Sequence, residues 1–227
     1  ATPPFLPNSK VTVSPKLNFP PDESFDKAKE HFIEFNAEIS GREISEMYYT
    51  TEINGYTFIV LGSETDRTAA YFSPEQLEWL DAEMAEAAKD DKPIFVISHW
   101  PINQSHGLPE TWGDKEPEPD DGGIGDESDA VNEILKKYGN VFMISGHLHN
   151  GIGDAATESI WSYTSVESEG SFHSINLPAY MYFNARGQVL NGNGFNFEVY
   201  DDEVIIRARS YSSEIWYTPY EYVIPLV

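Results

Sequence analysis

The chain contains no cysteine, and this absence removes several kinds of chemistry at once. Disulfide bonds, thiolate metal ligands and cysteine nucleophiles are excluded. The absence does not by itself fix the cellular compartment, because secreted proteins of the bacterial type also lack cysteine. Among the compartments left open, we expect an extracellular or cell-envelope location in preference to a cytoplasmic one.

Positive charge is also scarce: 14 Lys and Arg stand against 38 Asp and Glu in 227 residues, which gives a net charge of −24. A field of this sign repels phosphate backbones and anionic lipids, so nucleic acid and membrane surfaces are not expected as partners. No apolar run approaches the roughly 20 residues that a membrane-spanning helix needs. With 40% hydrophobic residues, the chain has the composition of an ordinary globular protein.

Regular structure is not expected in residues 1–21, where six prolines predict an irregular arm. Residues 22–227 show no linker and no internal repeat, so we predict a single domain there. An amphipathic helix is predicted over residues 23–39 and ends at Gly41. Its apolar positions are spaced by three and four residues: Phe25, Ala28, Phe32, Phe35 and Ile39.

Strand and helix patterns alternate through most of the remaining chain. Asn54-Gly55 predicts a tight hairpin turn between strands 46–53 and 56–61. Ser73 and Gln76 predict a helix that begins with a capping box. Two short, continuously apolar runs, 93–98 and 141–145, are typical of strands buried on both faces. With a hairpin over 195–210 and a last strand over 220–226, the pattern predicts an α/β fold with mixed sheets.

Histidines follow both buried strands. His99 comes directly after the first run, and His147 and His149 come after the second. In open α/β sheets, functional groups gather beyond the carboxyl ends of the strands. Neutral imidazole is a preferred ligand for zinc, iron and similar ions. We therefore predict that His99, His147 and His149 converge on a metal site.

Two segments resemble known signature blocks. Ile97-Ser98-His99-Trp100-Pro101 and Ser145-Gly146-His147-Leu148-His149 resemble the last two blocks of the calcineurin-like metallophosphoesterases. The strand ending at Glu64 and the helix beginning at Ser73 resemble the phosphodiesterase-like branch of that family. The resemblance implies the C-terminal portion of a four-layer αββα sandwich and the hydrolysis of phosphate mono- or diesters.

The same resemblance implies a metal centre with two divalent ions, for which Mn, Fe and Zn are the candidates. His99 and His147 would bind one ion, and His149 the other. The phosphate ester would be bound by both ions, which hold it for in-line attack.

The chain departs from the family by lacking its upstream blocks, Asp-x-His, Gly-Asp-x-x-Asp and Gly-Asn-His-Asp/Glu. The string 125–129 fits Gly-Asp-x-x-Asp, but it leads from a loop into a helix and is interpreted as a helix cap. Without a bridging carboxylate, two dications repel each other strongly at short range. We therefore expect a C-terminal part of a longer phosphoesterase that is inactive by itself. We also expect it to self-associate or to bind the missing upstream segment, because strands 93–98 and 141–145 would expose an edge.

Two other interpretations remain open. The chain is either a non-catalytic binding or structural module for a protein or glycan surface, or a single-metal hydrolase that uses its three histidines alone. His106, in the long loop 101–127, is a candidate contact for the substrate phosphate, although a solvent-facing loop residue is the simpler interpretation. Asp154 is a candidate carboxylate, although an exposed loop acid is the simpler interpretation. Trp100, Trp112 and Trp161 are candidate walls of a substrate cleft, and packing in the core is an equal alternative for them.

Overall fold

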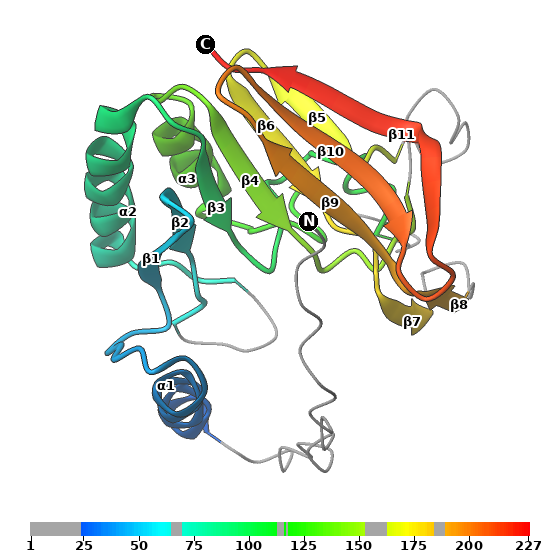
Figure 1. Ribbon diagram of the computed structural model, residues 1–227. Coiled ribbons are helices and arrows are strands. Elements are labelled where there is room, and N and C mark those ends of the chain that lie inside the picture. The colour runs from blue at the N-terminus through cyan, green and yellow to red at the C-terminus, as the bar shows by residue number, and fades with distance from the viewer. Residues whose placement is uncertain (1–23, 65–69, 113–115, 117, 153–162, 184–188) are drawn as a thin grey trace.

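The computed structural model describes residues 24–64, 70–112, 116, 118–152, 163–183 and 189–227 (Figure 1). The predicted arm at residues 1–21 lies outside the described residues, as do Asp154 and Trp161. None of the described helices combines the length and the apolar character needed to cross a bilayer.

A mixed sheet of six strands forms the centre of the fold, in the order β1-β2-β3-β4-β6-β5. The four inner strands run parallel to one another, and each of the two outer strands pairs antiparallel with the inner strand beside it. This arrangement confirms the predicted α/β class with a mixed sheet. The strands are β1 (Tyr49–Ile53), β2 (Tyr56–Val60), β3 (Ile94–Ile97), β4 (Val141–Ser145), β5 (Val166–Glu169) and β6 (Phe172–Asn176).

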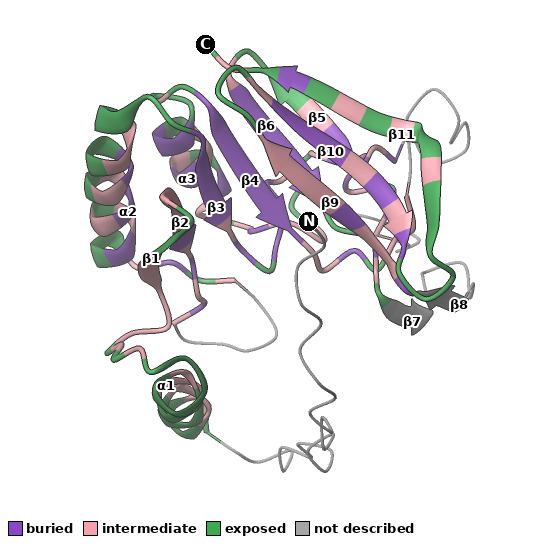
Figure 2. Ribbon diagram, in the orientation of Figure 1, coloured by how far each residue is buried: buried purple, intermediate pink, exposed green. Residues whose placement is uncertain are grey.

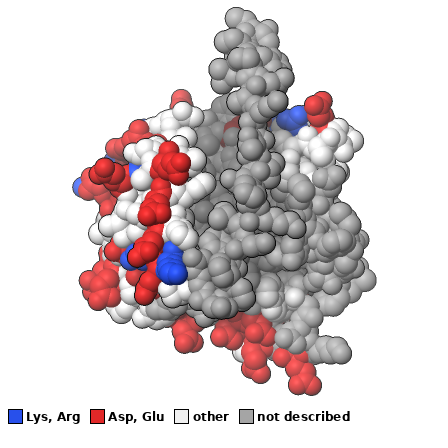
Figure 3. All heavy atoms as spheres, turned by 90° about the horizontal axis from the view of Figure 1, so that it is seen from below, with Lys and Arg blue, Asp and Glu red and all other residues white. Residues whose placement is uncertain are grey.

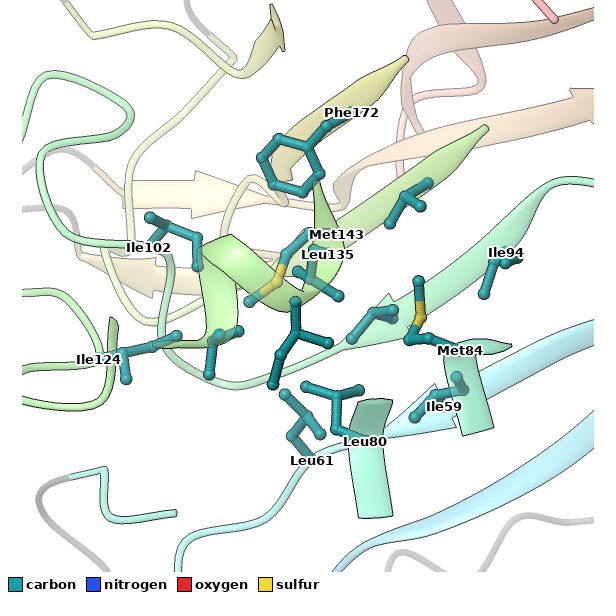
Figure 4. Close-up of a cluster of buried hydrophobic side chains, with 14 of the residues drawn as sticks. Ile59, Leu61, Leu80, Met84, Ile94, Ile102, Ile124, Leu135, Met143 and Phe172 are labelled. Atoms are coloured by element: carbon teal, nitrogen blue, oxygen red, sulfur yellow. The ribbon is translucent and has the colours of Figure 1, made fainter. Parts of the chain in front are cut away.

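Helices α2 (Pro74–Ala87) and α3 (Ser128–Leu135) cover one face of this sheet, with a short 3-10 turn at Ala88–Asp90. Alternate side chains of β3 and β4 explain the continuous apolar runs. Ile94 and Val96 pack against the helices, whereas Phe95 packs on the opposite face. Figure 4 shows the cluster on the helical face, where Leu80 and Met84 of α2 meet Ile59 and Ile94 of the sheet.

A second, three-stranded sheet covers the other face, in the order β11-β10-β9. Its strands are β9 (Asn193–Val199), β10 (Glu203–Ser210) and β11 (Ile215–Pro225), and a separate hairpin joins β7 (Met181–Phe183) to β8 (Val189–Asn191). The described elements thus form three layers, helices, large sheet and small sheet, where four were predicted (Figure 1). No described helix covers the outer face of the small sheet.

Helix α1 (Phe25–Ser40) confirms the predicted amphipathic helix. It ends at Gly41, whose N–H donates to the Ala37 carbonyl and whose φ of 65° turns the chain out of the helix. None of its residues is buried, and the side chains of Phe35 and Ile39 are 58% and 68% exposed. Figure 2 shows the helix with only intermediate and exposed surface, apart from the sheets.

The edge that was expected to be exposed at 93–98 and 141–145 is not exposed. β3 pairs with β2 on one side and β4 on the other, and β4 pairs with β3 and β6. The hairpin of β1 and β2 supplies the neighbour that was thought to be missing, so this expectation is wrong.

Only one half of the capping box predicted at α2 forms. Ser73 Oγ accepts the Gln76 N–H at 3.1 Å, as predicted, but it is Glu64 that accepts the Ser73 N–H, at 2.7 Å. The Gln76 side chain instead turns inward, donates to the Gly62 carbonyl at 2.9 Å and accepts the Gly62 N–H at 3.2 Å. This network ties the end of β2 to the start of α2.

The segment 125–129 leads from a loop into α3, as expected, but none of its side chains caps the helix. The N-cap residue is Glu127, which makes no side-chain hydrogen bond to the first turn. Ser128 Oγ instead accepts the Asn103 N–H at 2.8 Å, which joins α3 to the loop after β3.

Candidate metal-binding site

The carboxyl ends of β3 and β4 bring His99 and His147 into direct contact. Because the strands are parallel neighbours, the loops that follow them leave the sheet side by side. The Gly146 N–H donates to the His99 carbonyl at 3.1 Å, which joins the two loops. His147 Nδ1 lies 3.1 Å from His99 Nε2. The structure therefore confirms that these two histidines meet.

A tight turn presents His147, and Asn176 at the end of β6 supports that turn. His147 and His149 have φ values of 67° and 50°. The fully buried Asn176 side chain donates to the Gly146 carbonyl and, at 3.1 Å, to Ser145 Oγ. Its own carbonyl accepts the Tyr163 hydroxyl at 3.2 Å. The sequence analysis missed Asn176, whose available signal was its place directly after an apolar strand.

Two tryptophans surround His147, as expected for a cleft wall. The Trp112 ring stacks on the His147 imidazole, with 4.4 Å between the ring centres and an interplanar angle of 17°. The centre of the Trp100 ring lies 5.8 Å from that of the imidazole. A pocket of about 420 Å³ opens beside these rings, and its other wall includes Asp126 and Glu127. Figure 3 views the end at which β3 and β4 terminate, where acidic side chains outnumber basic ones on the described surface.

Their surroundings favour the neutral form of His99 and His147. Burial, followed by the neighbouring His99 and His149, lowers the pKa of His147 to about 4. Burial and then His149 also lower the pKa of His99. Neutral imidazole is the form that binds metal ions.

The donor atoms fit part of a metal site. An ion bound at about 2.1 Å to two nitrogens holds them roughly 3.0–3.4 Å apart, which agrees with the His99–His147 contact. Within the described part of the chain, however, no three His, Asp or Glu side chains form a group that could hold a metal. His149 therefore does not complete a three-ligand site there, and a two-metal centre needs ligands from outside these residues.

His106, the candidate substrate contact, lies in the protein interior. Its side chain is 0% exposed, with Nδ1 2.6 Å from the Thr164 carbonyl and Nε2 2.9 Å from Ser174 Oγ. Its backbone N–H donates to Glu167 at 2.9 Å. Both ring nitrogens are occupied, so His106 anchors the long loop to β5 and β6 and offers no nitrogen to a substrate.

Comparison with known proteins shows a likeness to a solved structure but to no curated sequence. No protein-family model matches the chain, and no curated protein matches its sequence. Among solved structures, the chain is similar to a dimetal phosphatase from Danio rerio, with 14% identity and a TM-score of 0.52. The match covers 79% of this chain and 60% of that one. The fold therefore resembles that of this dimetal phosphatase. At this identity the likeness concerns the fold alone, and the chain spans less than two thirds of the length of its neighbour.

Proposed function

We propose that this chain is part of a metal-dependent phosphoesterase that hydrolyses phosphate mono- or diesters. The observation that carries the proposal is the contact of His99 Nε2 with His147 Nδ1 at the ends of adjacent parallel strands. The similarity of the fold to that of a dimetal phosphatase supports the same assignment. The expected phosphodiesterase-like branch and the choice between mono- and diesters remain parts of this proposal.

In the proposed site, His99 and His147 bind one divalent ion and His149 contributes to a second. Mn, Fe and Zn remain the candidate metals. Such ions, when bound, stabilise the negative charge that develops on the transferred phosphoryl group. The chain contributes neutral ligands, a turn held by Asn176, and aromatic walls that limit the access of water.

We further propose that the carboxylate ligands come from polypeptide outside the described residues, and that this chain is the C-terminal part of a longer phosphoesterase. The unmatched part of the Danio rerio chain is consistent with such additional polypeptide. The chain by itself is then inactive or nearly so. Self-association and an extracellular or cell-envelope location also remain predictions.

The absence of a three-ligand group among the described residues favours one rival, a non-catalytic binding module. The same observation gives the three-histidine hydrolase no support. Metal binding distinguishes these interpretations, because His99 and His147 of a module without a metal site should bind no divalent ion.

The activity test measures phosphate release from 4-nitrophenyl phosphate and bis(4-nitrophenyl) phosphate with Mn²⁺, Zn²⁺ or Fe²⁺ added. We expect turnover by these 227 residues far below the ordinary range of about 1–10³ s⁻¹, dependent on metal and abolished in His147→Ala. His31→Ala, on the remote helix α1, is the control. Ordinary turnover would show that the chain has a complete site. Turnover that persists unchanged in His147→Ala would show that the site is elsewhere.

A further inference from the structure

A bulge in β11 opens a pocket in the small sheet. Arg207 of β10 pairs with Glu221 and Arg209 pairs with Trp216, so residues 217–220 of β11 stand opposite a single residue of β10. This excess of residues bends β11 away from its partner strand. The pocket at the bulge has a volume of about 380 Å³, within the range of about 300–1,000 Å³ typical of small-molecule sites. Figure 2 shows β11 as a largely exposed outer strand, so the pocket is accessible from solvent.

Three aromatic side chains line the pocket: Trp216, Tyr217 and Tyr220. Tyr217 and Tyr220 also pack against the buried cluster between the two sheets, which holds their rings in place. The Arg209 guanidinium lies over the Trp216 ring, with 4.9 Å between its central carbon and the ring centre. Trp216 is still 44% exposed, so part of its ring surface remains available to a ligand. The pocket therefore offers flat, apolar surfaces whose positions are set by the fold.

Arg207 and Glu221 add a hydrogen-bond donor and an acceptor to the same pocket. Arg207 Nε donates to Glu221 Oε2 at 2.6 Å, and Arg207 Nη1 donates to both carboxylate oxygens of Glu198, at 2.6 and 2.8 Å. Within the part of the chain that the structure describes, Arg207 Nη2 and Glu221 Oε1 have no hydrogen-bond partner. The two side chains are 33% and 45% exposed, so a ligand can reach them.

We propose that this pocket binds a neutral sugar ring of an oligosaccharide. A pyranose ring with equatorial hydroxyls presents C–H groups on its faces, and these groups stack on the negatively polarised face of an aromatic ring. The hydroxyls lie around the edge of the sugar, and each of them can both donate and accept a hydrogen bond. Two adjacent hydroxyls match the open groups of the pocket, since one donates to Glu221 Oε1 and the other accepts from Arg207 Nη2.

The charges around the pocket favour a neutral ligand over an ion. Glu198 and Glu221 together carry one more negative charge than Arg207 offsets, and the whole chain has a net charge of −24, so an anion is repelled. A cation in the pocket lies beside the Arg207 guanidinium, whose positive charge opposes it. The pocket is lined by residues of β10 and β11, so sugar binding does not depend on the proposed phosphoesterase site.

Isothermal titration of the full chain with cellotriose, triacetylchitotriose and mannotriose tests the proposal. We expect at least one of these trisaccharides to bind at least about tenfold more tightly than sorbitol, which carries hydroxyls on an open chain without ring faces. Benzenesulfonate and choline are the charged probes, and both should bind more weakly than that trisaccharide. No binding of any trisaccharide at about 10 mM, or equal binding of sorbitol or of a charged probe, would overturn the proposal.

Variants of the pocket locate the binding. Trp216→Ala should weaken the trisaccharide by about tenfold or more, whereas Trp216→Phe keeps a ring and should lose less. Tyr180→Ala removes an exposed aromatic side chain outside the pocket and should leave the affinity unchanged.

The acceptor is tested at Glu221, which also keeps the proposal falsifiable where Trp216→Ala folds poorly. Glu221→Ala should weaken binding by at least about fivefold, because it removes the acceptor oxygen. Glu221→Gln keeps an oxygen at that place without the charge, so its affinity should stay within about threefold of the wild type. Equal affinity of the wild type, Trp216→Phe and Glu221→Ala, or a loss in Glu221→Gln as large as in Glu221→Ala, would contradict a neutral sugar ligand in this pocket.

Discussion

Replacing Asn176 by leucine removes the support of the turn that presents His147. The two side chains have the same number and branching of non-hydrogen atoms, so the change acts mainly on hydrogen bonds. Asn176 makes three of them, to the Gly146 carbonyl, to Ser145 Oγ and from the Tyr163 hydroxyl. At a net value of about 1 kcal/mol each, their loss lowers the free energy of unfolding by about 3 kcal/mol. In a chain of this size that corresponds to a melting temperature roughly 6–12 °C lower.

The assay combines urea unfolding with nitrogen-detected spectra of the histidine rings. Asn176→Leu should also change the ring signals of His147 and His99, because the loosened turn no longer holds the two imidazoles together. Asn196→Leu is the matched control, since the half-buried Asn196 side chain makes a single long hydrogen bond, of 3.2 Å, to Glu198. Its effect should stay within about 0.5 kcal/mol. A loss of stability below about 1 kcal/mol in Asn176→Leu, with unchanged histidine signals, would refute the role assigned to Asn176.

Three further predictions concern the rest of the molecule. Burial lowers the pKa of His106. Below about pH 6.5 the unfolded chain therefore takes up a proton that the folded chain excludes, and the free energy of unfolding falls as the pH is lowered. Urea midpoints at pH 7.5 and 5 should differ less in His106→Asn than in wild type, and an equal difference would contradict this assignment. Gly62→Ala places a Cβ atom 2.2 Å from the Met47 carbonyl oxygen and should lower the free energy of denaturant unfolding by about 1–3 kcal/mol. Gly139→Ala, the control, should lower it little, and equal effects of the two changes would contradict the packing argument. The exposed apolar side chains of Phe35 and Ile39 on α1 should cause self-association in sedimentation over a concentration series, and a strict monomer would contradict that expectation.

Local patterns predicted the elements that depend on neighbours in the sequence. Asn54 and Gly55 have the positive φ values, 54° and 81°, that their turn requires. The apolar runs of β3 and β4 correctly indicated strands buried on both faces and placed side by side. The end of β3 then fixes where His99 lies, which is why the contact with His147 could be inferred.

The remaining features depend on contacts between distant residues. An amphipathic pattern shows that a helix such as α1 has an apolar face, but it does not show that another element covers that face. The partners of Gln76 and His106 depend on strand register and on the path of a long loop, which no local signal encodes. Asn176 supports the site from a third strand, so its role became visible only in the folded arrangement.

The central claim is that His99 and His147 are metal ligands, and histidine ring spectra during a zinc titration test it most directly. The account predicts that the ring nitrogen signals of His99 and His147 respond together to Zn²⁺, while those of the buried His106 and of His173, which is bonded to Ser168 Oγ, do not. It also predicts that His147→Ala abolishes the response of His99. Zinc that leaves both rings unchanged would contradict the account.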